Sequence, residues 1–136
     1  RSVLSLADLI NRIKSTNNND GVLTALEVAG LDLKGTQLVV LSACETGLGD
    51  VKVGSGLYGL RRALVMAGSQ SQVLSLWLVS DDGTKDLMVK YYQGLKAGKG
   101  RHQALRDAQL ELLSTPGYEH PYFWAAFVPS GNWAGL

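Results

Sequence analysis

QLVVLSA, at Gln37–Ala43, is a short apolar run that is rich in β-branched residues. Such a run is typical of a buried strand. A second run of the same kind, QVLSLWLV, occupies Gln72–Val79. Between the two, apolar residues recur every three or four positions through Ser55–Ala67, which predicts a helix with one buried face. A strand, a helix and a strand in this order predict two parallel strands joined by a crossover helix.

Further patterns extend this arrangement toward the carboxyl terminus. The sequence DDGT at Asp81–Thr84 offers cap residues for a helix that runs to about Ala97, and a second helix is predicted at Arg101–Leu113. The run YFWAAFV predicts a third strand at Tyr122–Val128. We therefore expect an α/β fold, a parallel sheet flanked by helices, in which residues 1–136 form a single domain.

Patterns before the first run are weaker. Thr24 and Glu27 match a capping box, which predicts a short helical turn that ends near Gly30. Apolar residues between Leu6 and Ile13 recur at helical spacing, although the first residues of the chain could equally be extended.

Composition excludes several classes of protein. Lys and Arg number 13 and Asp and Glu 12, a net charge of +1, so the chain lacks the basic field that nucleic acids or anionic membranes attract. No apolar run approaches the ~20 residues that a membrane-spanning helix needs. The one cysteine, Cys44, fits a reducing compartment, so we expect a cytoplasmic protein. The two histidines stand far apart, so we expect no bound metal.

The glycines Gly54, Gly56 and Gly59 form a G-x-G-x-x-G pattern, and Asp81 lies 22 residues beyond the last of them. In dinucleotide-binding proteins this loop follows its strand directly and delivers the pyrophosphate to the helix N-terminus. Here ten residues separate Ala43 from Gly54. A glycine-rich loop that allows close helix–sheet packing is therefore the simpler interpretation, and we expect no cofactor.

Cys44 follows the first predicted strand, and Asp81 follows the second. Because the carboxyl ends of parallel strands meet at one edge of a sheet, where α/β proteins bind their ligands, we expect both residues at that edge. A lone cysteine is most simply a small buried side chain, but at this edge it could act as a nucleophile. Its base is not evident, because His102 lies on a polar helix face and His120 is expected at the opposite edge. Asp81 could equally cap the following helix.

Residues 38–49, LVVLSACETGLG, resemble the CHAT domain family, caspase-like cysteine peptidases that are often fused to tetratricopeptide repeats. The similarity continues in four further segments, GVLTALEVAGLDL at 21–33, GSGLYGLRRALVMAG at 54–68, SLWLVSD at 75–81 and HPYFW at 120–124. It covers about Gly21 to Asn132. The resemblance implies a caspase-like sheet in three layers with helices on both faces.

The resemblance also implies cleavage of peptide bonds by Cys44, whose Ser-Ala-Cys context matches the family's nucleophile motif. The Cys44 amide would contribute to the oxyanion hole. Ser75 and Trp77 match the segment that lines the substrate cleft. Asp81 matches an acidic position that would select Arg or Lys before the scissile bond through a charge-assisted pair.

Three departures from the family pattern affect this expectation. First, the family's catalytic His precedes the Cys, whereas no His precedes Cys44 in this sequence. The other two are Ser55 and Ser80, each at a position where many members carry an acidic residue. We therefore expect the chain to be the C-terminal, Cys-bearing part of a CHAT domain, inactive alone. Its His would lie on an upstream segment of the same protein, either in the same chain or in a separate one. The domain would be fused or bound to a repeat or sensor region.

Two other functions stay open. One is a non-catalytic protein-interaction module that has the same fold and leaves Cys44 idle. The other, less favoured, is a nucleotide-binding domain that uses Gly54, Gly56 and Gly59.

Overall fold

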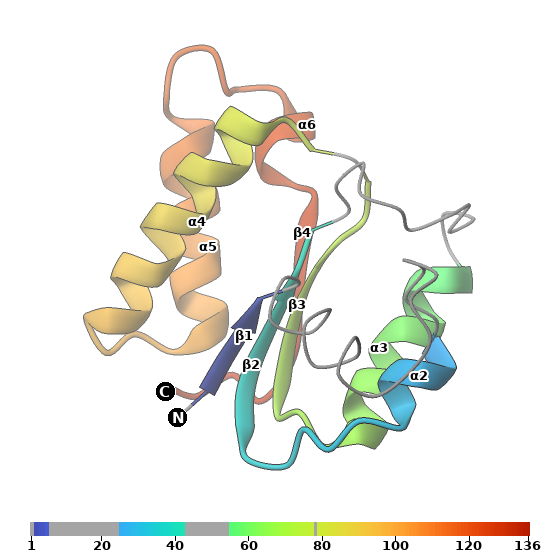
Figure 1. The fold of residues 1–136 in the computed structure, drawn as a ribbon. Coiled ribbons are helices and arrows are strands. Elements are labelled where there is room, and N and C mark those ends of the chain that lie inside the picture. Colours follow the sequence, from blue (N-terminus) through green and yellow to red (C-terminus); the bar gives the residue numbers. More distant parts are fainter. Residues whose placement is uncertain (1, 6–24, 43–54, 78) are drawn as a thin grey trace.

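The computed structural model describes residues 2–5, 25–42, 55–77 and 79–136. In chain order its elements are β1 (Ser2–Ser5), α2 (Ala25–Ala29), β2 (Thr36–Leu41), α3 (Ser55–Ala67), β3 (Ser71–Ser75), α4 (Asp81–Lys96), α5 (Arg101–Leu113), α6 (Pro121–Trp124) and β4 (Phe127–Gly131). The strands form one sheet in the order β1, β2, β3, β4 (Figure 1).

Most of the predicted elements are confirmed. Two helices, α3 and α5, occupy the predicted ranges, and α4 ends one residue before the predicted Ala97. The short turn before Gly30 is α2, and the first described residues are extended as β1. Strand β3 ends at Ser75 and is therefore shorter than the predicted run to Val79. The capping residue Thr24 and the helical pattern of 6–13 lie outside the described residues.

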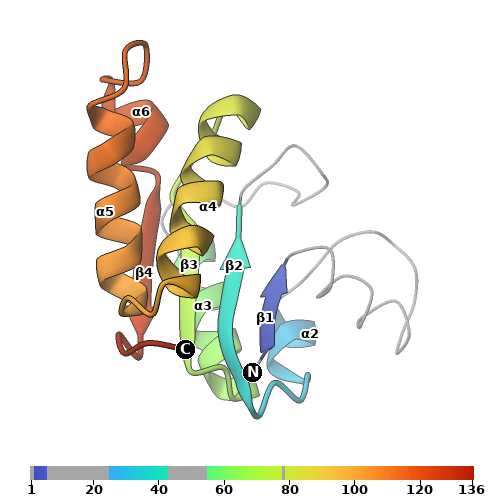
Figure 2. The same cartoon turned by 90° about the vertical axis from the view of Figure 1, so that its left-hand side faces the viewer.

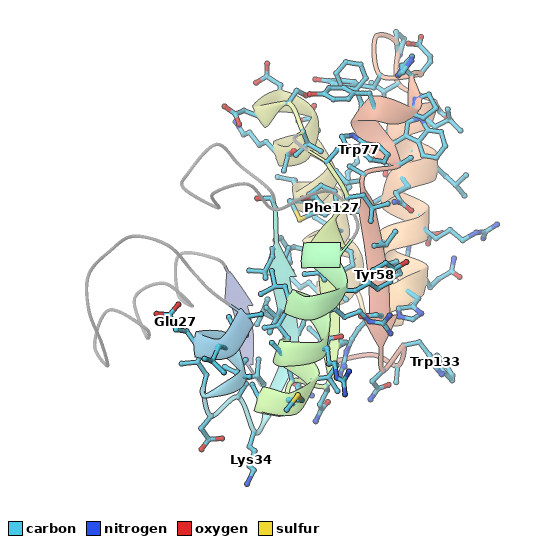
Figure 3. All side chains as sticks on the ribbon, turned by 90° about the vertical axis from the view of Figure 1, so that its right-hand side faces the viewer. Glu27, Lys34, Tyr58, Trp77, Phe127 and Trp133 are labelled. Atoms are coloured by element: carbon cyan, nitrogen blue, oxygen red, sulfur yellow. The ribbon has the colours of Figure 1, made fainter. Side chains whose placement is uncertain are left out.

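The two faces of the sheet carry separate apolar cores, which confirms the three-layer arrangement. Successive residues of a strand point to opposite faces. In β2, Leu38 and Val40 pack into a core with α4 and α5, whereas Val39 and Leu41 pack into a core with α2 and α3. Figure 2 shows α4 and α5 on the near side of the sheet, and Figure 3 shows α2 and α3 covering the other side. Burial on both faces explains why Leu38–Leu41 of this strand form an unbroken apolar run.

The prediction of an all-parallel sheet is wrong for its last strand. Strands β1, β2 and β3 are parallel, but β4 pairs with β3 in the antiparallel direction. The run predicted as a strand at Tyr122–Val128 instead forms the single turn of α6, and β4 follows at Phe127–Gly131. Pro121 favours the helical turn, because its fixed φ suits the first helical position and its missing N–H is not needed there.

The direction of β4 follows from the two helices that precede it. Helix α4 leaves the carboxyl edge of the sheet, and α5 returns from the amino edge (Figure 1). A single crossover helix returns the chain to the amino edge, where a parallel strand can start. A second helix brings the chain back to the carboxyl edge, so the next strand must run in the opposite direction.

Arg101 marks the amino edge of the sheet. Its side chain is buried at the first position of α5, with 2% of the residue exposed. Its Nη1 donates to the carbonyl of Gln37 at 3.0 Å and to Oγ of Ser71 at 3.1 Å. Because Gln37 and Ser71 lie at the starts of β2 and β3, this one guanidinium connects two strands and a helix.

Candidate functional site at the carboxyl edge of the sheet

The parallel pair β2–β3 defines the edge at which the predicted site lies. Leu41, the last residue of β2, pairs with Leu74 of β3, so the chain leaves both strands on the same side of the sheet. The chain continues from β2 through Ser42 toward Cys44, which lies outside the described residues. From β3 it continues to α4, which begins at Asp81 (Figure 1). The expectation that Asp81 occupies the carboxyl edge is confirmed.

Ser75 and Trp77, predicted to line a substrate cleft, differ in exposure. Ser75 ends β3 and is buried, with 4% of the residue exposed. Trp77 is partly exposed, and its indole Nε1 donates to the carbonyl oxygen of Tyr122 at 3.2 Å. Figure 3 shows Trp77 at the end of the molecule where α6 lies. Of the two, Trp77 is therefore the side chain that a bound molecule can reach.

Asp81 and Asp82 occupy the first turn of α4, and both are exposed. The N-cap of this helix is Ser80, whose Oγ accepts from the backbone N–H of Gly83 at 3.3 Å. Ser and Asp are both favoured N-cap residues, so Ser80 caps this helix although many members of the family that the sequence resembles carry an acidic residue there. The Asp81 carboxylate is consequently not used as the cap. It gains stability from the positive end of the helix dipole and faces solvent.

His120 lies at the carboxyl edge, and the expectation that it lies at the opposite edge is wrong. The expectation assumed a parallel third strand, whereas β4 is antiparallel, so the residues just before it lie beside the end of β3. His120 is exposed and is the N-cap of α6: its Nδ1 accepts from the backbone N–H of Tyr122 at 3.1 Å. Sequence reasoning missed α6, although Pro directly after His120 is a helix-start signal.

Aromatic rings join α6 to the first turn of α4. Phe123 makes edge-to-face contacts with Tyr118 and Tyr122, with ring centroids 5.2 and 5.3 Å apart. A Cβ added at Gly83 would lie 3.2 Å from the Phe123 ring, so a glycine allows this close approach. The pKa of Tyr118 is raised by desolvation and by the nearby carboxylate of Asp86. The carboxylates of Asp82 and Asp86 on α4 therefore lie near Tyr118, whose ring contacts Phe123 of α6.

His102, the second histidine, lies on α5 and is partly buried. Its Nε2 is buried without a hydrogen-bond partner in the described part of the chain. In the glycine pattern, Gly56 and Gly59 lie inside α3, and Gly54 lies outside the described residues. Across the described ranges, no three His, Cys, Asp or Glu residues gather as metal ligands, and no helix has the length and apolar character to cross a membrane.

The sequence matches a known family over nearly its whole length. The family model of the CHAT domain matches residues 1–132. The chain belongs to the CHAT domain family. For a CHAT domain, the observed arrangement of a sheet between two helical layers is the expected α/β fold. The match also begins earlier in the chain than the resemblance at Gly21, and it ends at the same Asn132.

Two curated relatives contain a segment similar to this CHAT domain. Both are tetratricopeptide repeat protein 28, from Mus musculus and from Homo sapiens, and each is 32% identical over 111 residues. The aligned segment is 82% of this chain and 4% of each relative. In these relatives the similar segment is thus a small part of a much longer protein.

Proposed function

We propose that this CHAT domain is the Cys44-bearing part of a cysteine endopeptidase that cleaves after Arg or Lys. The observation that carries the proposal is the position of Asp81. Its exposed carboxylate is not used as a cap and lies at the sheet edge where β2, the strand before Cys44 in the chain, ends. In α/β proteins, this is the edge at which ligands bind. Membership of a caspase-like family supports the reaction type.

The proposed reaction proceeds in two steps. The Cys44 thiolate attacks the scissile carbonyl, a C–S bond forms, and the C–N bond breaks as the leaving amine takes a proton from the catalytic imidazole. A water molecule then gives a proton to the imidazole and attacks the thioester, which releases the acid and restores the Cys44 thiolate and the protonated imidazole. The Cys44 backbone amide donates to the oxyanion in both steps.

The preference for a basic residue follows from the charge of Asp81. A carboxylate that pairs with Arg or Lys forms a charge-assisted hydrogen bond, which neutral or acidic side chains cannot form. Trp77, partly exposed at the same edge, is assigned to the wall of the cleft, and the buried Ser75 to its support. Asp82, beside Asp81 in the same exposed turn, reinforces the negative potential.

The catalytic imidazole is proposed to come from an upstream segment of the same protein and not from His120. The Nδ1 lone pair of His120 is used by the N–H of Tyr122. This hydrogen bond occupies a ring nitrogen that a general base would need to present to the reacting groups. His120 is therefore a cap rather than a general base.

The proposed setting is a longer cytoplasmic protein that also contains tetratricopeptide repeats. The curated relatives are named for these repeats, and the aligned segment is 4% of their length. Stacked helical repeats offer extended concave surfaces for partners, which suits a sensor that controls a peptidase.

The test is a cleavage assay on peptides that differ only in the residue before the scissile bond, with Arg, Lys, Leu or Glu at that position. The protein is assayed alone and joined to the proposed upstream segment. Cleavage of the Arg and Lys peptides that requires Cys44 supports the proposal. Faster cleavage of the Leu or Glu peptide would overturn the specificity, and cleavage that persists in Cys44→Ala would overturn the nucleophile.

A second candidate function, a non-catalytic interaction module, is supported by the outward face of α3. Tyr58, Val65 and Met66 are 71, 52 and 68% exposed on this helix, beside the exposed Arg61 and Arg62. The helix has no acidic residue in its sequence. An apolar stripe with two arginines suits a partner helix whose apolar stripe is flanked by carboxylates. A second copy of the chain would place like charges together.

The two candidates are separated by two variants of the longer protein. If the domain is an interaction module, Arg61→Glu with Arg62→Glu abolishes its cellular activity and Cys44→Ala leaves it unchanged. If the domain is a peptidase, Cys44→Ala abolishes cleavage, and Arg61→Glu with Arg62→Glu leaves cleavage unchanged.

A further inference from the structure

We infer that His120 is a positioning residue for Trp77, and that the backbone of Tyr122 connects the two side chains. The assignment of Trp77 to the substrate cleft rests on the proposed function, whereas the connection between the residues does not. The inference assigns a task to the HPYFW segment at 120–124, which the proposed reaction leaves without one.

Both backbone polar groups of Tyr122 are used by these two side chains. Its N–H donates to Nδ1 of His120 at 3.1 Å, and its carbonyl oxygen accepts from Nε1 of Trp77 at 3.2 Å. His120 and Tyr122 are 2 residues apart, but Trp77 and Tyr122 are 45 apart. The imidazole therefore lies two hydrogen bonds from an indole that a different part of the chain supplies.

Helix α6 depends on its cap more than a long helix would. It has only four residues, and an isolated helix of one turn is unstable in water. Its first residue, Pro121, has no N–H, so the N–H of Tyr122 is the first donor that needs a partner. His120 supplies this partner through Nδ1 and also accepts from the N–H of Phe123 through its carbonyl, at 3.0 Å. Loss of the imidazole removes the side-chain hydrogen bond that caps the turn.

The position of Trp77 depends in turn on α6. The ladder between β3 and β4 is extended by the N–H of Leu76, which donates to the carbonyl of Ala126 at 2.7 Å. Beyond Leu76, the indole bond to Tyr122 is the hydrogen bond that ties this segment to α6 within the described part of the chain. A frayed α6 moves the carbonyl of Tyr122, so the indole loses its acceptor, although its ring still packs against the apolar core.

The test compares His120→Ala with His120→Asn. Alanine removes the cap, whereas the Asn side chain has an oxygen that can accept from the same N–H, since Asn is among the favoured N-cap residues. The measured quantity is the solvent-exchange rate of the Trp77 indole N–H in nitrogen-15 spectra, with the signal assigned by its loss in Trp77→Phe. Trp133, which is 70% exposed, supplies an internal reference signal.

Gln103→Ala is the matched control variant. It also removes one exposed side-chain hydrogen bond, from Nε2 of Gln103 to Asp107 at 2.7 Å, but near the start of α5, at the amino edge of the sheet. We expect it to leave the Trp77 signal unchanged. We expect His120→Ala to accelerate indole exchange about fivefold, the equivalent of a cap worth ~1 kcal/mol, and His120→Asn to stay within about twofold of the wild type.

Two results would overturn the inference. An unchanged Trp77 signal in His120→Ala would show that the cap does not act on the indole. A His120→Asn variant that loses the Trp77 signal would show that packing of the imidazole ring, and not its acceptor nitrogen, holds the indole in place. The His120→Asn measurement decides the question even where His120→Ala does not fold. A protein without Cys44-dependent cleavage would contradict the proposed function alone, because the indole measurement needs no activity.

Discussion

Phe127, the first residue of β4, lies opposite Ser75, the last residue of β3. This antiparallel pairing determines what surrounds the candidate site. It places α6, which directly precedes β4, at the edge where β2 and β3 end. The indole of Trp77, two residues beyond Ser75, consequently donates to the carbonyl of Tyr122 in α6. A parallel β4 would put this segment at the far end of the sheet.

The first prediction concerns the charge of Asp81. Asp81→Asn keeps the shape of the side chain and removes the carboxylate that is proposed to pair with Arg or Lys. We expect kcat/KM for an Arg peptide to fall about 10- to 100-fold, because a hydrogen bond between charged groups contributes about 1.5–3 kcal/mol. Asp82→Asn, in the same exposed turn, is the control and should cost about threefold or less. Equal losses in the two variants would contradict the specific assignment of Asp81.

The second prediction concerns the catalytic base. The protein without an upstream His is expected to cleave Arg peptides about 10²–10⁴-fold more slowly than the same protein with the proposed segment, since a general base contributes that factor. His120→Asn should leave the rate nearly unchanged in both forms, because its Nδ1 acts as a cap. Full activity of the 136-residue chain alone would contradict the upstream His.

The third prediction concerns the end of β4. Gly131 has a φ of 83°, and a Cβ there would lie 3.0 Å from the Cα of Ser71, with the carbonyl of Gln70 closer still. Gly131→Ala should therefore lower the free energy of unfolding by about 3 kcal/mol, from backbone strain and the clash together. Gly117→Ala is the matched control: its φ is 92° with no atom within 4 Å, so strain alone should cost about 1 kcal/mol. Urea unfolding measures both, and equal values would show that the contact with β3 is unimportant.

The fourth prediction concerns the buried guanidinium at the amino edge. Arg101→Met keeps the apolar length of the side chain and removes the guanidinium donor to the hydroxyl of Ser71 and to the carbonyl of Gln37, which keeps only the Ser71 hydroxyl as a side-chain donor. We expect a loss of about 2–3 kcal/mol in the free energy of unfolding, since hydrogen bonds from a charged group are strong. Arg106→Met, exposed on the same helix, should change stability by less than about 0.5 kcal/mol. A loss in both variants would point to helix propensity instead.

Much of the fold could be predicted because local patterns report local burial. The run around Val39 is apolar throughout since it is covered on both faces, and the helical spacing in Ser55–Ala67 matches the buried side of α3. For the candidate site, the order of strand ends was enough to place Asp81 at the carboxyl edge. The role of Cys44 remains a proposal that rests on the family motif, because the residue lies outside the described part of the chain.

By itself, the sequence determined the α/β class, the family, the bounds of the long helices and the side of the sheet at which Asp81 lies, since each is encoded in residues close together in the chain. Only the tertiary structure decided the direction of β4, the burial of Arg101 and the place of His120. Each of these depends on where distant segments meet. Helix α5 returns the chain to the carboxyl edge, and Arg101 donates to acceptors on two strands. Helix α6 supplies the carbonyl that accepts from Trp77. A local pattern carries no information on such contacts, because the same run of residues is compatible with either strand direction.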